Sequence, residues 1–208
     1  MSEYKFNPKK YSTHDVLAKL LREHSITESL VLDVGCNDGY IAQAVRLGVW
    51  TGIDNNQESV KKAKESGVYQ EVYLDNLNAS SFDYLKDDDY DVILCADVLE
   101  HLKDPQRILT ILHRLLKKDG LFIVSLPNVA NITARLNLLF GKKHTKTGIL
   151  DETHLHFYNT YSAKKLLENN KFRVTNVYYG SSVFGILFKV LPLGNLLGHG
   201  IILVGRKC

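Results

Sequence analysis

Short apolar runs alternate with amphipathic stretches along most of this chain. Residues 30–34 contain four apolar residues in five, two of them β-branched valines, which is typical of a buried strand. Comparable runs predict further strands at residues 49–54, 71–75, 91–96, 121–126, 171–179 and 200–206. Apolar residues at helical spacing, several of them preceded by capping residue types, predict helices near 16–21, 40–45, 57–66, 105–116, 130–140 and 160–169.

Strands that alternate with helices of this length predict an α/β fold, because parallel strands need crossover connections, and these are right-handed. At 208 residues the chain is long enough for one full core, so we expect a single domain over residues 1–208. Residues 129–158 interrupt the alternation after the fifth strand. Because this insert would overhang the edge where ligands bind, we expect it to form a lid and to contact the acceptor substrate.

Acidic residues mark the carboxyl ends of four predicted strands. Asp33 lies within the first strand, Asp54 and Asp75 close the next two, and Asp97 directly follows the fourth. Ligands of parallel α/β sheets bind outside the carboxyl ends of the strands. Four acids along one edge are hard to explain by folding alone, and they predict a ligand site there.

The first strand runs into a loop that contains Gly35, Asn37 and Gly39, and a helix follows. Glycine lets the backbone approach a ligand closely, so strand, loop and helix form a ligand-binding element. A dinucleotide would place its pyrophosphate in this loop, where the carboxylate of Asp33 would repel it. A ligand with cationic groups would be favoured instead. S-adenosylmethionine carries a sulfonium and an ammonium group, and we predict that it contacts this loop, Cys36 included.

Asp54 follows Asp33 by 21 residues, near the spacing expected of a carboxylate that binds ribose hydroxyls. The competing interpretation is a helix N-cap for residues 57–66, a role that Asn55 or Asn56 could fill instead. We favour the ribose role because Asp54 closes a strand directly after the glycine loop, and we count Asn55 among the cofactor contacts.

The third strand ends in a second candidate group for the nucleoside. Asp75 and Asn76 could bind the edge of an adenine, and Leu77 could cover its face. A turn stabilised by an Asx side chain is the competing account. We predict the adenine role.

A net charge of +3 is too small to argue for a nucleic-acid partner by itself, and we do not expect one. Residues 129–150 nevertheless carry four basic side chains and no acid. This favours an anionic small-molecule acceptor such as a phosphorylated or nucleotide-linked sugar, although exposed lysines are often only solvated. The basic residues are Arg135, Lys142, Lys143 and Lys146.

Three cysteines without metal-ligand spacing indicate a reducing compartment. The polar N-terminus lacks a signal peptide and no apolar run approaches about 18 residues, so we expect a cytoplasmic protein. Residues 183–197 are strongly apolar. We favour a buried connection for them and keep contact with an anionic membrane surface, or with a lipid-linked acceptor, as the alternative.

These features resemble the class I S-adenosylmethionine-dependent methyltransferases over nearly the whole chain. Asp-Val-Gly-Cys-Asn-Asp-Gly at 33–39 is similar to the family's first motif, with Asn37 in place of a glycine, and Gly-Ile-Asp ending at Asp54 is similar to the second. Asp-Val-Leu-Glu-His-Leu at 97–102 resembles a run in small-molecule methyltransferases of the ubiquinone-biosynthesis and sugar-modifying types. Thr-His-Leu-His-Phe-Tyr at 153–158 is similar to stretches in methyltransferases of polysaccharide gene clusters.

The resemblance implies a Rossmann-like, seven-stranded, mostly parallel sheet in the order 3-2-1-4-5-7-6, with the last strand antiparallel and helices on both faces. It implies that Asp33 and the glycine loop surround the methionine end of the cofactor, while Asp54 binds the ribose. It places adenine at Asp75 and Asn76. The residues that would wall the site are Ala96, Asp97 and Val98. The enzyme would methylate a small-molecule acceptor (a sugar, a nucleotide-sugar or a quinone-like compound) and release S-adenosylhomocysteine.

Methyl transfer from a sulfonium is an in-line displacement, so the protein mainly positions the two substrates and removes a proton where necessary. The candidate bases are His101, His154 and His156, and Tyr158 could orient the acceptor. For each histidine a structural hydrogen bond is the competing interpretation.

A metal site is a further hypothesis. Asp97, Glu100 and His101, with His154 or His156, could bind a divalent metal, as similar residues do in small-RNA 2′-O-methyltransferases. Because the Asp-x-x-Glu-His run is common in metal-free relatives, we predict no metal. An RNA 2′-O-methyltransferase and a non-catalytic nucleotide-binding module stay as alternatives. An NAD-dependent oxidoreductase is disfavoured by Asp33 and by the missing Gly-x-Gly-x-x-Gly.

Overall fold

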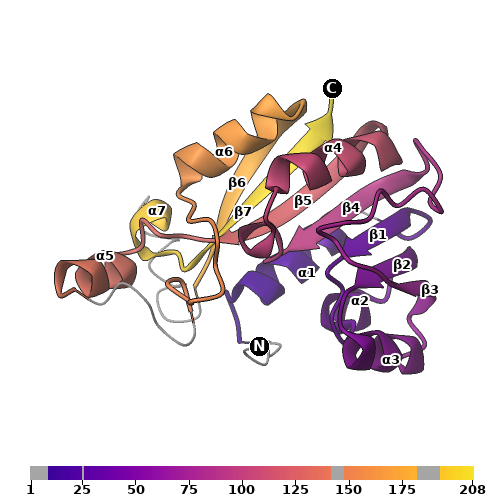
Figure 1. Cartoon of the computed structure of the whole chain (residues 1–208), viewed down its shortest axis with the longest axis horizontal. Coiled ribbons are helices and arrows are strands. Elements are labelled where there is room, and N and C mark those ends of the chain that lie inside the picture. Colours follow the sequence, from indigo (N-terminus) through magenta and orange to yellow (C-terminus); the bar gives the residue numbers. More distant parts are fainter. Residues whose placement is uncertain (1–8, 25, 142–147, 182–192) are drawn as a thin grey trace.

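The computed structural model describes residues 9–24, 26–141, 148–181 and 193–208, which form a central sheet with helices on both sides (Figure 1). The sheet has seven strands in the order β3-β2-β1-β4-β5-β7-β6. Neighbouring strands from β3 to β5 are parallel, and β7 is antiparallel to both β5 and β6. The predicted fold class and strand order are therefore confirmed. The strands are β1 (Leu30–Val34), β2 (Val49–Asp54), β3 (Tyr69–Leu74), β4 (Tyr90–Ala96), β5 (Leu116–Pro127), β6 (Phe172–Gly180) and β7 (Gly200–Lys207).

The two faces of the sheet are covered by different helices. Helices α1 and α2 share an apolar cluster with Val92 and Leu94 of β4, whereas α4 and α6 pack with Ile93 and Cys95 on the opposite face. Such alternation within one strand is expected where both faces of a parallel sheet are buried. Helix α3 packs beside β2 and β3. The helices are α1 (Thr13–Glu23), α2 (Tyr40–Val45), α3 (Gln57–Glu65), the 3-10 turn η1 (Leu99–His101), α4 (Pro105–Leu115), α5 (Ile132–Leu139), α6 (Thr160–Asn169) and α7 (Gly194–Leu197).

Helix starts follow the capping residues of the sequence. Ser12 accepts a hydrogen bond from the backbone of Asp15, and Asp104 accepts one from that of Arg107. Asn159 forms a capping box at the start of α6. Each cap satisfies a backbone N–H that the first turn of a helix leaves unpaired, and therefore fixes where the helix begins.

Strand β5 differs from the prediction, because it begins at Leu116 rather than at residue 121. Its pairing with β4 shifts register between Tyr90 and Val92, and Asp119 has a positive φ of 60°. Asp119 and Gly120, a pair of residue types typical of turns, therefore form an irregularity inside one long strand. A bulge of this kind keeps a strand continuous while it changes direction locally.

The two ends of the insert 129–158 lie together. Asn128 forms an isolated bridge with Tyr158, and the N–H of Val129 donates to the Tyr158 carbonyl at 2.9 Å. No helix in the described ranges is long and apolar enough to cross a membrane. Most of the apolar segment 183–197 lies outside the described residues, although its last residue, Leu197, is buried in α7.

Candidate functional site

The loop between β1 and α2 requires glycine at its first position. Gly35 has a φ of +74°, and a Cβ there would lie 2.3 Å from Cγ2 of Val98. The backbone N–H of Gly35 donates to the carbonyl of Ile53 in β2 at 2.8 Å. The loop after β1 is therefore held between β2 and the segment that follows β4, and any side chain at position 35 would separate them.

Asn37 replaces the middle glycine of the motif without changing the handedness of the loop. Its φ is +48°, and Gly39 follows with +79°. Asparagine is one of the few residues other than glycine that adopts this left-handed conformation readily. Its side-chain oxygen accepts from the N–H of Asp38 at 2.7 Å. The side chain of Cys36 is buried among residues of α3 and β3, so its contact with a cofactor would come from its backbone.

Asp54 is buried at the end of β2 and joins two loops. One carboxylate oxygen accepts from the N–H of Asn37 at 2.9 Å and the other from the N–H of Asn56 at 2.8 Å. The N-cap of α3 is Asn56, which accepts from two backbone N–H groups, and Asn55 is exposed. Asp54 therefore does not cap the helix. Each of its oxygens keeps a second lone pair for a ligand hydroxyl.

Asp33 is buried and accepts a hydrogen bond from the hydroxyl of Tyr69 at 2.7 Å. Burial raises the pKa of Asp33 to about 7 against the lowering effect of that hydrogen bond, and the nearby charge of Asp54 raises it further. A cationic ligand would favour the ionised form. Tyr69 lies 36 residues from Asp33 and belongs to no motif, so no sequence pattern indicated this contact.

The group predicted to bind adenine is held by local hydrogen bonds. One oxygen of Asp75 accepts from the N–H of Asn76 at 2.7 Å, and the other accepts from the hydroxyl of Tyr84 at 2.7 Å. Asn76 accepts from the N–H of Asn78, so an Asx turn is present as well. Leu77 packs in the core. Its predicted role over the adenine face stays a prediction, as do the roles of Asp75 and Asn76.

After β4 the chain turns sharply at Asp97, whose φ is +52°. Its N–H donates to the carbonyl of Ser125 at 3.1 Å, and its carboxylate accepts from the Ser125 hydroxyl at 2.7 Å. This turn follows the half-buried Ala96 and carries Val98 against Gly35. The three residues predicted to wall the site therefore lie beside the glycine loop.

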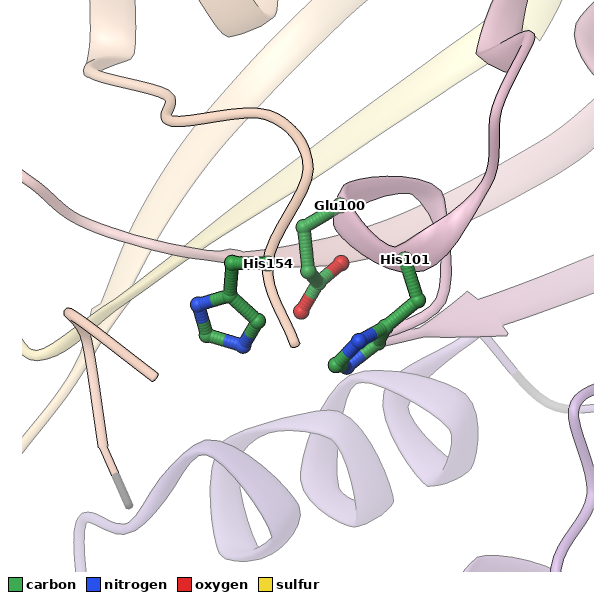
Figure 2. Close-up of side chains that lie close together, drawn as sticks. All are labelled: Glu100, His101 and His154. Atoms are coloured by element: carbon green, nitrogen blue, oxygen red, sulfur yellow. The ribbon is translucent and has the colours of Figure 1, made fainter. Parts of the chain in front are cut away.

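Glu100, His101 and His154 form a cluster between the turn η1 and the insert (Figure 2). One ligand atom from each residue lies within 4.8 Å of the others. Figure 2 shows the carboxylate of Glu100 between the two imidazole rings. Glu100 is fully buried, and neither carboxylate oxygen has a hydrogen-bond partner among the described residues. Burial raises the pKa of Glu100 well above its usual range, and the charge of Asp97 adds to this.

The two histidines of the cluster have similar partners. Nδ1 of His101 lies 3.3 Å from the carbonyl of Thr153, and Nδ1 of His154 lies 3.1 Å from the carbonyl of Ile149. A carbonyl can only accept, so Nδ1 carries the proton and Nε2 keeps its lone pair. Burial lowers the pKa of His101, and the neighbouring His154 lowers it further.

The other two predicted catalytic residues lie outside this cluster. Nε2 of His156 is 3.0 Å from the carbonyl of Leu102, a bond that anchors the insert to the segment after η1. Tyr158 is buried, and burial together with the nearby Glu100 raises its pKa to about 12. Of the four predicted catalytic residues, only His101 and His154 therefore lie in the cluster with Glu100. The catalytic roles of all four stay predictions.

Comparison with known families agrees with this arrangement. The profile of a family described as "Methyltransferase domain" matches residues 6–177. The chain belongs to this family of methyltransferase domains. The predicted class I methyltransferase family, and S-adenosylmethionine as the cofactor of that class, are thereby confirmed at the level of the family.

The curated relatives include two proteins named ubiquinone biosynthesis O-methyltransferase. The one from Vibrio atlanticus is 29% identical over 158 residues, which cover 72% of this chain and 66% of the relative. The one from Pasteurella multocida is 34% identical over 118 residues, which cover 50% of this chain and 49% of the relative. This chain thus spans between about half and two thirds of the length of these relatives.

Solved structures share the fold. Magnesium protoporphyrin IX methyltransferase from Synechocystis, solved with bound S-adenosylhomocysteine, has a TM-score of 0.68 at 19% identity, with 94% of this chain and 82% of that chain covered. A SAM-dependent methyltransferase from Aquifex aeolicus has a TM-score of 0.63 at 21% identity, with coverage of 98% and 100%. At these identities the similarity establishes the fold.

Proposed function

We propose that this protein transfers a methyl group from S-adenosylmethionine to a hydroxyl group of a small-molecule acceptor. Membership of a methyltransferase-domain family supports the reaction class. The relatives named ubiquinone biosynthesis O-methyltransferase favour oxygen as the acceptor atom.

The position of Asp54 carries the proposal. Its carboxylate is fixed by the N–H groups of Asn37 and Asn56 at 2.9 and 2.8 Å, and it stands between the glycine loop and the start of α3. A buried carboxylate fixed in this way keeps a free lone pair on each oxygen, which suits the two hydroxyls of a ribose. Asp33 lies in β1 directly before the same loop, and its carboxylate would favour binding of the cationic methionine end of the cofactor.

When bound, S-adenosylmethionine supplies a methyl group on a sulfonium, and transfer of that group to oxygen leaves the neutral thioether. The protein must bring the acceptor oxygen in line with the methyl group and deal with the hydroxyl proton. Asp97 and Val98 lie beside the glycine loop, and Glu100 and His101 follow them directly. The acceptor hydroxyl would thus meet the histidine pair next to the donor.

His101 and His154 are placed to contact the acceptor hydroxyl. His101 is exposed and His154 half-buried, so an acceptor can reach both side chains. The lowered pKa of His101 keeps its imidazole neutral at pH 7, with Nε2 able to accept. We place the acceptor hydroxyl at this pair, so that its proton is lost there during transfer.

The insert favours an acceptor with an apolar part. Helix α5 and the residue after it expose four large apolar side chains: Leu136, Leu138, Leu139 and Phe140. A quinol-like acceptor would cover such a surface, whereas a sugar or nucleotide-sugar would leave it in water. The lysines that suggested an anionic acceptor (Lys142, Lys143 and Lys146) lie outside the described residues. The cytoplasmic location stays a prediction from the cysteines, the polar N-terminus and the lack of a long apolar run in the sequence.

A methyl-transfer assay tests the proposal. The purified protein is incubated with isotopically methyl-labelled S-adenosylmethionine and one acceptor at a time: a catechol-type phenol with an alkyl chain, a nucleotide-sugar, and a short RNA. We expect label on the phenol oxygen only, and no transfer by Asp54→Ala. Transfer to RNA or to the nucleotide-sugar instead would overturn the assignment of a quinol-like acceptor. Transfer to none of the three would overturn the proposed activity.

A further inference from the structure

We propose that Glu100, His101 and His154 bind one divalent transition-metal ion, and that this ion holds the acceptor hydroxyl beside the methyl donor. The metal site rests on the geometry of the three side chains. Its role toward the acceptor rests on the proposed function. The sequence led us to predict no metal. The structure favours one because it brings three of the candidate ligands, Glu100, His101 and His154, close together.

Two of the five residues first considered as ligands have other partners. The carboxylate of Asp97 accepts from the hydroxyl of Ser125 at 2.7 Å, and Nε2 of His156 lies 3.0 Å from the carbonyl of Leu102. The three that remain each direct a side-chain ligand atom into one small region.

Glu100 is the strongest indication of a cation. A buried carboxyl group normally has hydrogen-bond partners, because loss of hydration without replacement costs about 1–3 kcal/mol or more. Both oxygens of Glu100 lack such a partner within the described residues, while the carboxylate points toward the two imidazoles (Figure 2). A bound cation would compensate the charge and the unmet hydrogen bonds together.

The histidines are already oriented as metal ligands are. Metal-binding histidines usually donate their other ring N–H to a carbonyl or carboxylate, which fixes the tautomer and the ring direction. Here both Nδ1 atoms lie against backbone carbonyls, those of Thr153 and Ile149. Each Nε2 therefore offers its lone pair to an ion.

The backbone holds the two halves of the site together. The carbonyl of Glu100 accepts from the N–H groups of Leu155 and His156 at 2.8 and 3.2 Å. Asp151, buried in the same loop, accepts from the N–H and the hydroxyl of Thr153. These bonds fix the loop that carries His154 against the turn that carries Glu100.

Two imidazoles and one carboxylate suit zinc and related transition metals, and three protein ligands leave positions open for a substrate. Metal–ligand bonds of about 2.0–2.2 Å place the ligand atoms of a tetrahedral site roughly 3.3–3.5 Å apart. In the structure the ligand atoms lie within 4.8 Å of one another, so binding an ion requires them to move closer together.

An ion at this position explains how a hydroxyl becomes a nucleophile. Held by Glu100, His101 and His154, the ion would leave a coordination position for the acceptor oxygen and would lower the pKa of the acceptor hydroxyl, whose proton would then pass to solvent. The oxygen then forms the bond to the methyl carbon as the carbon–sulfur bond breaks, and sulfur keeps that electron pair. The histidines act as ligands in this scheme, and not as the final proton acceptor.

Cobalt titration of the chelator-treated and dialysed protein tests the site without substrate or methyl donor. We expect about one Co²⁺ per chain, with the visible absorption of a four- or five-coordinate ion, and competition by Zn²⁺. Glu100→Gln, His101→Ala and His154→Ala should each weaken binding at least roughly tenfold. His156→Ala, from the same loop but outside the cluster, is the matched control and should weaken cobalt binding much less than the three cluster variants.

Affinity for S-adenosylmethionine, measured for every variant, shows that the donor half is still folded. No saturable cobalt binding, or binding that is as tight in Glu100→Gln and in both cluster-histidine variants as in the wild type, overturns the metal site. Full methyl transfer by the chelated protein overturns its role toward the acceptor. If cobalt binds as expected but none of the acceptors is methylated, the proposed function fails and the metal site stands.

Discussion

Two regions of the molecule are built in different ways. One is the edge formed by the loops after β1, β2 and β3, which we propose to bind the methyl donor and call the donor region. The other is the cluster of Glu100, His101 and His154, which we propose to contact the acceptor and call the acceptor region. In the donor region the key bonds join loops on neighbouring strands, as between Asp54 and Asn37, 17 residues apart. In the acceptor region they join η1 to the insert, as between His101 and Thr153, 52 residues apart. The first depends on the sheet itself, and the second on how a long connection folds back.

This difference separates two properties of the enzyme. Cofactor affinity should depend on residues that the sheet positions, whereas turnover should depend on residues that the insert positions. Substitutions in one region should leave the property of the other almost unchanged. The following predictions test this separation, beginning with the largest effect.

Gly35→Ala should be the most damaging substitution. It places a Cβ 2.3 Å from Cγ2 of Val98 and forces alanine to a φ of +74°. We expect a loss of about 2–4 kcal/mol in the free energy of unfolding, and at least a roughly hundredfold loss of S-adenosylmethionine affinity. Denaturant unfolding and calorimetry measure the two.

Gly67→Ala is its control, because its φ is +67° but no atom lies within 4 Å of the added Cβ. It should cost about 1 kcal/mol and leave cofactor affinity unchanged. Equal effects of the two substitutions would show that the contact with Val98 does not matter.

Asp54→Ala removes a carboxylate that accepts hydrogen bonds from two loops and that we propose to bind the ribose. We expect S-adenosylmethionine affinity to fall by about a hundredfold or more, with a smaller loss for Asp54→Asn, which keeps one acceptor oxygen. Asp87→Ala, the control, removes an exposed acid that pairs with Arg114 and should leave S-adenosylmethionine affinity unchanged. Unchanged calorimetric affinity in Asp54→Ala would remove the ribose assignment.

His101→Ala and His154→Ala should lower kcat by about a hundredfold and change S-adenosylmethionine affinity by less than about threefold. His156→Ala breaks the bond to the Leu102 carbonyl. It should cost about 1 kcal/mol of stability with a smaller loss of kcat. Steady-state kinetics on a methylated acceptor and thermal unfolding separate the cases. A loss of cofactor affinity in the histidine variants would contradict the division into two regions.

Asp33 should give the smallest effect, a pH dependence of cofactor binding. With a pKa of about 7 in the free protein, its ionised fraction rises between pH 6 and pH 8, and affinity for the cation should rise with it by roughly tenfold. The groups around it are the hydroxyl of Tyr69 and the carboxylate of Asp54. Asp33→Asn should bind more weakly and with no pH dependence in this range.

The same group has the opposite effect on stability. The folded protein holds the Asp33 proton up to a pKa of about 7, while the unfolded chain releases it near pH 3.9. The contribution of Asp33 to the free energy of unfolding therefore falls as pH rises from about 4 to 7. Asp33→Asn should gain stability relative to the wild type over that interval, and a constant difference would contradict the raised pKa.

Much of the donor region could be predicted from the sequence, because side-chain periodicity identifies strands and the topology brings their carboxyl ends together. The side-chain hydrogen bonds that hold its acids could not be predicted as well. Tyr69 and Tyr84 bond to Asp33 and Asp75, but neither lies in a motif. The irregularity of β5 at Asp119 could not be predicted either, because an Asp-Gly pair indicates a turn whether or not the strand continues through it.

The acceptor region was the harder part to predict. Sequence alone left three histidines equivalent, because their partners are carbonyls that no side-chain pattern reveals. The backbone carbonyl of Glu100 accepts from the N–H groups of Leu155 and His156, a contact that no side-chain pattern reveals. Only the folded insert shows that its carboxylate is left facing two imidazoles.

The donor site is the central claim, and native mass spectrometry of the purified full chain tests it most directly. We predict that added S-adenosylmethionine or S-adenosylhomocysteine binds one molecule per chain, that Asp54→Ala shows neither complex at the same concentration, and that NAD gives none. Binding of NAD in place of both nucleosides, or equal occupancy in Asp54→Ala, would contradict the assignment of this edge.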